Sequence, residues 1–293
     1  ISPLINSKKL LDISKDILLM NELGVLNNDF NNAPIYRSVP FMINFCEEII
    51  NQSINPKKIN FLFKTFVKSI KLNNDLWEIY VDNANIIKSK NLILSSSLIA
   101  HPRCLEILKT NSLPLRDAFQ PGKDKIVDSV LRETGKLIYI KRKTYIFYVF
   151  NLLLVQKFNH SYLQIFFSNV IKKDINLEKI IFQRQSDGSM VIVLHCAYIN
   201  NLSDINTEKI IKILSEIFVN YRIFLDLFSA ARLIDKMYWR SSQPLNHLLP
   251  KELQWSSSSK IGFCGDWIDL NSSGGVESAM NSSIRLAKLL NWQ

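Results

Sequence analysis

The stretch Ile261-Gly-Phe-Cys-Gly-Asp-Trp-Ile268, followed shortly by Ser273-Gly-Gly-Val-Glu-Ser-Ala279, is where this sequence says most about its fold. The chain has only eight glycines in 293 residues, and four of them lie between positions 262 and 275. An average protein has about 7% glycine. Glycine is needed where the backbone takes a positive φ or approaches another group closely. A glycine-poor chain that gathers its glycines here therefore indicates a backbone requirement at this place.

The residue order within this stretch predicts a strand, a turn and a helix. Residues 261–264 are apolar and predict a buried strand, which ends at Gly265 and leaves the carboxylate of Asp266 at its carboxyl end. After the polar residues 271–273, a helix is expected to open near Gly275. Its predicted buried face is Val276, Ala279, Met280, Ser283, Ile284, Ala287 and Leu290. The free N–H groups at such a helix start favour a partial negative charge.

This strand, Gly-Asp pair, polar loop and Gly-Gly-Val-Glu helix start resemble the C-terminal flavin-binding segment of the FAD-dependent amine oxidases, most closely their renalase-like branch. The resemblance implies that Asp266 reaches the ribityl–pyrophosphate part of FAD, and that the backbone N–H of Val276 faces the flavin pyrimidine edge. Gly265, Gly275 and Glu277 complete the implied cofactor contacts. A helix N-terminus suits the negative charge of a reduced flavin. The alternative is that these glycines serve only the packing of a strand on a helix.

The first part of the chain resembles the same family in the order of its elements. A helix is predicted over residues 1–30, ending at Gly24, and a second follows Ser38-Val-Pro-Phe-Met42 and stops before Pro56. Strands are predicted over 60–70, 77–81 and 91–95, before a helix that Pro102 opens. On the family pattern, Val67 stands for the residue beside the FAD adenine. An ordinary strand valine is the other interpretation.

The middle of the chain differs in composition. Long apolar and aromatic strands alternate with polar turns, and a helix is predicted over residues 207–219, which together indicate a mixed sheet with a covering helix. The basic run Lys141-Arg142-Lys143 is expected in a turn or at a solvated edge. Residues 237–244 resemble the family's Trp-Arg-x-Ser-Gln segment, so Trp239 and Arg240 are candidates for the substrate side. A Trp in a buried strand is, however, more often part of the core.

Together these patterns predict an α/β (α+β) fold. We expect an incomplete, doubly wound FAD-binding domain over residues 1–124 with a helical substrate-side segment at its start. A mixed-sheet substrate domain with covering helices is expected over 125–245, and a C-terminal FAD-binding segment over 246–293.

Composition narrows the function classes. The net charge is +10, but the basic residues are spread along the chain among Asn and Ile, so we expect no nucleic-acid partner. No apolar run reaches about 18 residues, so no membrane span is expected. The four cysteines form no CxxC pair, which favours a reducing, cytoplasmic compartment. The four histidines show no ligand spacing, and no metal site is expected.

The Gly-x-Gly-x-x-Gly turn that a FAD protein of this class uses for the diphosphate is missing from the sequence. Since the chain also starts at Ile1, we expect a fragment of a longer FAD-dependent oxidoreductase. The resemblance implies hydride transfer to flavin from a small reduced substrate, nicotinamide-like or an amine, with molecular oxygen as acceptor. It names no catalytic acid or base. The competing hypothesis is a flavin-free remnant that acts as a non-enzymatic binding protein.

Overall fold

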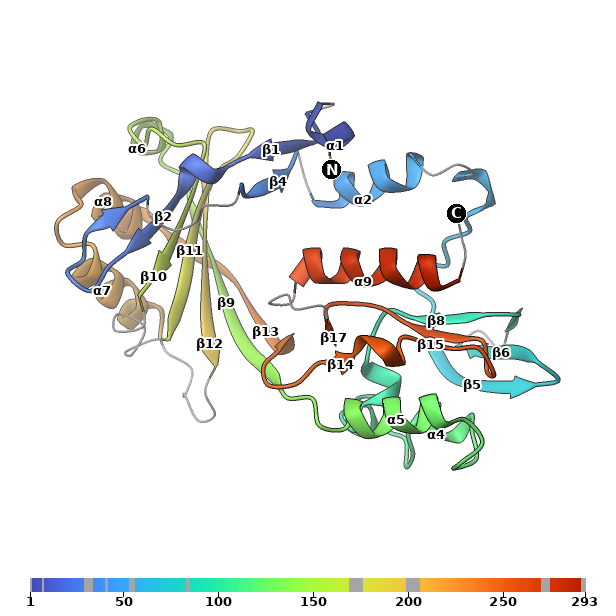
Figure 1. The fold of residues 1–293 in the computed structure, drawn as a ribbon. Coiled ribbons are helices and arrows are strands. Elements are labelled where there is room, and N and C mark those ends of the chain that lie inside the picture. Colours follow the sequence, from blue (N-terminus) through green and yellow to red (C-terminus); the bar gives the residue numbers. More distant parts are fainter. Residues whose placement is uncertain are drawn as a thin grey trace. The chain divides into compact units, whose positions relative to one another are not determined.

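The computed structural model describes residues 2–6, 8–28, 34–39, 42–52, 56–82, 85–168, 176–198, 206–269 and 275–290. The fold is mixed α/β, as predicted (Figure 1). Contacts divide the chain into two compact units, each built from two segments. Unit 1 holds Ile1–Asn60 and Lys141–Arg240, and unit 2 holds Phe61–Ile140 and Ser241–Gln293. The units therefore alternate along the chain. The predicted arrangement, in which 1–124 and 246–293 bind FAD and 125–245 binds the substrate, stays a prediction.

Unit 1 is built on a seven-stranded sheet with the strand order β13-β9-β12-β11-β10-β2-β3. Neighbouring strands from β9 to β10 run antiparallel, β10 runs parallel to β2, and β2 pairs antiparallel with β3. The strands are β2 (Ile17–Met20), β3 (Leu26–Asn27), β9 (Tyr139–Val149), β10 (Tyr162–Phe167), β11 (Leu177–Arg184), β12 (Met190–Tyr198) and β13 (Arg232–Pro244).

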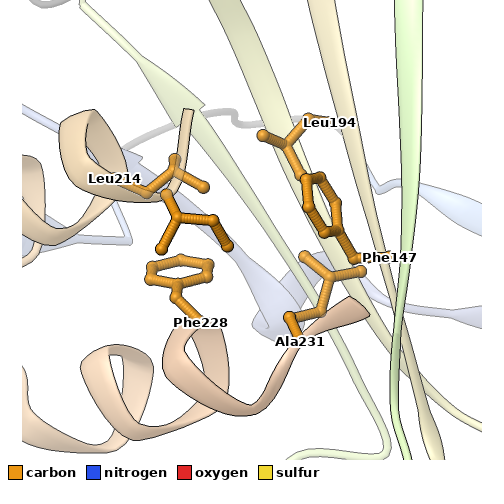
Figure 2. Close-up of a pocket in the computed structure, with 7 residues that line it drawn as sticks. Phe147, Leu194, Leu214, Phe228 and Ala231 are labelled. Atoms are coloured by element: carbon orange, nitrogen blue, oxygen red, sulfur yellow. The ribbon is translucent and has the colours of Figure 1, made fainter. Parts of the chain in front are cut away.

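Helices α7 (Thr207–Ile217) and α8 (Arg222–Ala230) cover one face of this sheet (Figure 1). Figure 2 shows the apolar layer between them, where Phe147 and Leu194 of the sheet face Leu214 and Phe228 of the helices. The space that these side chains enclose has essentially no volume that a water molecule could enter. This face of the sheet is therefore a filled core.

The N-terminal segment of unit 1 corrects the helix predicted over residues 1–30. Of the residues described there, only Ser2–Asn6 (α1) form an α-helix, and β1 (Leu10–Asp12), a 3-10 turn (Ser14–Asp16), β2 and β3 follow. Residues 17–20 pair with β10, more than 140 positions away, so a partner distant in sequence overrides the apolar spacing. β1 pairs with β4 (Tyr36–Ser38), and α2 (Met42–Asn51) confirms the second predicted helix before a 3-10 turn at Pro56–Lys58.

The basic run Lys141-Arg142-Lys143 is also placed differently from the prediction. It lies inside β9 and pairs with β12, so it is neither a turn nor an edge. Its middle residue, Arg142, forms a two-point ion pair with Glu178 of β11, while Lys143 is 7% exposed with its ammonium 5.0 Å from the ring centre of Tyr238. Strand β9 ends at Val149 and is followed by α6 (Leu152–Gln156).

In its described residues, unit 2 has three small sheets. One is the meander of β5 (Val67–Asn73), β6 (Leu76–Val81) and β7 (Ile86–Ser89), with Asn74 and Asp75 at positive φ in the turn between β5 and β6. Strand β6 confirms the strand predicted over 77–81, whereas β5 begins and ends later than the strand predicted over 60–70. Strand β16 (Ile261–Phe263) lies between β15 (Trp255–Ser256) and a parallel β8 (Leu92–Leu94), and β14 (Leu249–Pro250) pairs with β17 (Ile268–Asp269).

Short helices complete unit 2 around a core that includes Trp77, Phe263 and Trp267. They are α3 (Cys104–Leu108), α4 (Pro114–Asp117), α5 (Lys125–Thr134) and the longer α9 (Gly275–Leu289), with 3-10 turns at Leu98–Ala100 and Lys251–Leu253. Asp124 begins α5 by accepting the N–H groups of Ile126 and Val127. Its second oxygen accepts three hydroxyls, from Ser256, Ser258 and Ser259, and this ties α5 to the loop before β16.

Candidate functional site

The turn after β16 contains Gly265, which no other residue can replace unless the neighbouring atoms move. Gly265 has φ +131°, and a Cβ built there would lie 2.6 Å from the indole of Trp267 and 2.7 Å from the carbonyl oxygen of Ser95. The Trp267 indole N–H donates to the Cys264 carbonyl at 2.8 Å. Gly265 is therefore required by close approach of its neighbours, and not only by its backbone angle.

Helix α9 packs on β16 through serines. The Gly265 N–H donates to the Ser282 hydroxyl at 2.8 Å, and Gly262 leaves the space that Leu286 fills, since a Cβ there would lie 3.0 Å from it. The buried residues of α9 are Ser278, Ser282 and Leu286. The predicted buried face is wrong in this respect, because Val276 is 56% and Ile284 is 52% exposed. Because the serine side chains are small, α9 can lie close to β16, where Gly262 has no side chain.

The side-chain position of Gly275, at the start of α9, has no close neighbour among the described residues. Gly275 has φ +83°, and a Cβ there would meet none of their atoms within 4 Å. Glu277, like Val276, is exposed, and by helix geometry their N–H groups have no partner within the helix. Residues 271–274, which hold the polar loop and Gly274, lie outside the described residues. Gly275 is therefore needed for its backbone conformation, because no described residue would obstruct a side chain there.

Asp266 connects the turn to this helix start, because its carboxylate accepts a hydrogen bond from the Gly275 N–H. Burial raises the pKa of Asp266 above its ordinary value, while that bond and the charge of Arg103 act in the opposite direction. The structure thus brings together Gly265, Asp266 and Gly275. A half-buried carboxylate at a helix start can accept hydroxyl hydrogens from a polar ligand.

Three residues near this turn were missed by the sequence interpretation. The Arg103 guanidinium stacks over the ring of Tyr139, 4.2 Å from its centre, and the Tyr139 hydroxyl is hydrogen-bonded to Ser97. Nε and Nη1 of Arg103 are buried and have no hydrogen-bond partner among the described residues. Ser97 follows β8 closely, so the available signal was a polar residue at the carboxyl end of a parallel strand.

The remaining predicted site residues lie on other elements. Val67 is the first residue of β5, opposite Val81 at the outer edge of the meander, and is 37% exposed. Trp239 and Arg240 belong to β13 of unit 1. The Trp239 indole N–H donates to the Thr144 hydroxyl at 3.1 Å, whereas Tyr238 lies with Lys143 on the opposite face. Strand alternation places Arg240 on the face of Tyr238.

Other site types find no support in the part of the chain that is described. No group of three or more His, Cys, Asp or Glu residues there could hold a metal ion. No helix among the same residues is long and apolar enough to cross a bilayer. Burial raises the pKa of the thiols of Cys104, Cys196 and Cys264, which opposes a role as nucleophile.

No family model and no curated protein matches the sequence. Among solved structures, an oxidoreductase from Methanosarcina mazei is 12% identical with a TM-score of 0.46, over 78% of this chain and 49% of that one. A fatty acid isomerase from P. acnes that produces CLA is 9% identical with a TM-score of 0.45, over 78% and 47%. The tetracycline destructase Tet(51) is 13% identical with a TM-score of 0.42, over 98% and 63%.

The chain thus spans about half the length of the first two structures, which it covers to 49% and 47%. At identities of 9–13% and TM-scores below 0.5, these likenesses say nothing of what the chain binds.

Proposed function

We propose that this chain is part of a FAD-dependent oxidoreductase whose flavin binds at the start of α9. The observation that carries the proposal is the Asp266 carboxylate, which is half-buried after β16 and accepts the N–H of Gly275, a residue with no described neighbour within 4 Å of a Cβ built on it. These residues fit a bound FAD by their donor and acceptor chemistry. Asp266 can accept a hydroxyl hydrogen, and Val276 can donate its backbone N–H.

Each residue has a separate part in this proposal. Asp266 would hold the ribityl–pyrophosphate region, and the positive end of α9 would stabilise negative charge at the pyrimidine edge. Arg103 supplies positive charge near Asp266, and its two buried N–H groups would be available as hydrogen-bond donors to the cofactor. When bound, FAD supplies the hydride acceptor for a small reduced substrate, nicotinamide-like or an amine, and passes electrons to molecular oxygen.

A FAD diphosphate normally rests on a glycine-rich helix start, and this sequence has no Gly-x-Gly-x-x-Gly. We propose that another segment of the polypeptide supplies it. Residues 1–293 alone should therefore bind FAD weakly, because the diphosphate would lack its main group of backbone donors.

FAD binding, followed by flavin fluorescence, tests the proposal in two polypeptides. One is residues 1–293, and the other adds the natural coding sequence upstream. The longer protein should be yellow, and Asp266→Ala should weaken its FAD affinity at least about tenfold, as expected for a bond to a charged group. The exposed Asp75→Asn in the β5–β6 turn is the matched control and should leave the affinity unchanged.

A longer protein that folds, binds no FAD and stays colourless would contradict the proposal. That result would favour the flavin-free binding protein instead. An Asp266→Ala variant that binds FAD as tightly as the parent would move the flavin site away from the start of α9.

A further inference from the structure

The face of the seven-stranded sheet opposite α7 and α8 carries a row of polar and aromatic side chains across five strands. Strand pairing aligns Thr144 with His195, His195 with Lys179, and Lys179 with Phe166. Trp239 joins the row through its hydrogen bond to Thr144. We call Trp239, Thr144, His195, Lys179 and Phe166 the polar row. The large core under α7 and α8 lies on the other face, and of the polar row only Phe166 packs against the smaller buried cluster of Ile13, Ile17 and Tyr162.

Hydrogen bonds within the polar row fix the orientation of its histidine. The Trp239 indole donates to the Thr144 oxygen at 3.1 Å, so the Thr144 hydroxyl hydrogen is free to go to Nδ1 of His195 at 3.2 Å. Burial and the charges of Lys179 and Arg142 lower the pKa of His195 to about 4, so the ring is neutral at pH 7. Its remaining proton is therefore on Nε2, which has no partner in the described part of the chain.

The charged side chains beside His195 carry a net positive charge. Glu178 is held by Arg142 at both carboxylate oxygens, with N–O distances of 2.5 and 3.1 Å. Lys179 is half-buried, and among the described residues its ammonium forms no ion pair, only a contact 5.8 Å from the ring centre of Phe166. Burial and the charge of Arg142 lower the pKa of Lys179, while the charge of Glu178 acts in the opposite direction. Because Glu178 already bonds to Arg142, its single negative charge offsets only part of the positive charge of Arg142 and Lys179, and an anion beside Lys179 would offset the rest.

The neighbouring positions on the same face are apolar. Ile181 and Val193 are cross-strand partners, each two residues from Lys179 or His195 and therefore on the same face. Both are half-buried, and Phe166 adds an aromatic ring beside Lys179. Ile181 and Phe166 also pack against the buried cluster of Ile13, Ile17 and Tyr162, so only their remaining exposed surface is open to a ligand. Two hydrogen-bond donors thus lie next to an apolar surface, and a carboxylate has two oxygens to accept from them.

We propose that His195 and Lys179 form a binding site for the carboxylate of a small organic anion whose apolar body lies over Ile181, Val193 and Phe166. The site lies within unit 1 and does not depend on flavin binding. The Nε2–H of His195 and the ammonium of Lys179 donate to the two carboxylate oxygens. Trp239 and Thr144 position the histidine and do not contact the ligand.

Calorimetric titration of the full chain with benzoate tests this site. Lys179→Met keeps the apolar stem and removes the charge, so the variant should fold and lose at least about tenfold in benzoate affinity, as expected for a bond to a charged group. Lys212→Met, exposed on α7 over the other face, is the matched control and should bind benzoate as the parent does. His195→Gln retains an N–H donor and should bind more tightly than His195→Leu.

Neutral and purely ionic probes separate the parts of the proposal. Benzyl alcohol has the ring without the charge, and inorganic phosphate has charge without the ring, so both should bind at least tenfold more weakly than benzoate. The proposal is overturned if the parent binds no benzoate at millimolar concentration, or if Lys179→Met binds it equally well. Benzyl alcohol or phosphate binding as tightly as benzoate would overturn it too. Should Lys179→Met not fold, the two His195 variants decide, and equal affinity in both overturns it.

Discussion

The turn after β16 in unit 2 and the polar row of unit 1 are both candidate sites, but they are built in opposite ways. In the turn, the backbone comes close to its neighbours at Gly265, and the side chains that hold it are mostly short serines. In the polar row, ordinary strand residues, among them His195 and Lys179, become neighbours only through the register of five strands. A site that depends on glycines can be recognised in the sequence, whereas a site that depends on strand register cannot.

The largest effect should come from the turn itself. Gly265→Ala places a methyl group 2.6 Å from Trp267 and 2.7 Å from a backbone oxygen, at φ +131°. We expect a loss of about 3 kcal/mol or more in the free energy of unfolding, since both strain and overlap contribute. Urea denaturation measures it. Gly122→Ala is the control, because φ is +82° but no atom lies within 4 Å, and it should cost only about 1 kcal/mol.

If the two alanine variants lost equal stability, the turn would be constrained by its backbone angle alone. The close approach of Trp267 and Ser95 would then have no energetic role. The turn and the polar row would differ less than their structures indicate.

Glycine scarcity allowed the strand, the turn and the start of α9 to be predicted, because each rests on a local backbone demand at Gly265 or Gly275. The buried face of α9 was not predicted. The predicted face followed the spacing of the apolar residues and left out Ser278 and Ser282, yet both are buried and Ser282 is bonded to the backbone of Gly265. Polarity fails as a guide where a hydroxyl satisfies a buried backbone group.

The polar row could not be found in the sequence. Residues 144, 179 and 195 are adjacent only because β9, β12 and β11 pair in one register. Pairing also shifts between Leu177 and Lys179, and the Glu178 carboxylate meets Arg142 nearby. Such irregularities depend on the partner strand, so no periodicity in the sequence reveals them.

The next largest effect should come from Asp124, which holds the loop before β16. Asp124→Asn weakens the hydroxyl bonds from the serines before β16 and the bonds that cap α5, and should cost about 2 kcal/mol. Burial alone would raise the pKa of Asp124, but these bonds hold it below 3.8. Its contribution is therefore complete above pH 3.8 and is lost as pH falls through the lower, folded-state pKa.

The check is urea denaturation of the parent and Asp124→Asn at pH 7 and pH 3. The stability difference between them should shrink at the lower pH. A difference that stays constant would mean that the charge of Asp124 contributes nothing to holding the loop.

A smaller effect is expected in the polar row. Thr144→Val keeps the shape of a residue that is 3% exposed but removes the hydroxyl between Trp239 and His195, at a cost of about 1 kcal/mol. Without the hydroxyl, Nδ1 of His195 loses its hydrogen-bond donor. The neutral imidazole should then be a mixture of the Nδ1–H and Nε2–H tautomers. Nitrogen-15 chemical shifts of the imidazole measure this. An unchanged Nε2–H form in the variant would show that another group fixes the ring.

The smallest effect, on thiol reactivity, compares the two regions directly. Cys264 lies in the turn and Cys196 in the sheet, and both are buried, while Cys46 is exposed. Burial raises the pKa of Cys264, and burial with the charge of Glu178 raises that of Cys196 to about 12, so Cys46 should react first with iodoacetamide. Because Cys264 can be exposed by opening a short turn, whereas Cys196 lies between two long strands, Cys264 should follow and Cys196 should react last.

Gly265→Ala should therefore speed the labelling of Cys264 more than that of Cys196, as mass spectrometry of the digested protein would record. The methyl group strains only the turn, so local opening becomes easier there while the sheet keeps its pairing. If both thiols gained reactivity by the same factor, the turn would open only when the rest of the chain opens. The strain at Gly265 would then destabilise the sheet as well. The turn and the polar row would not differ in local stability, although they are built differently.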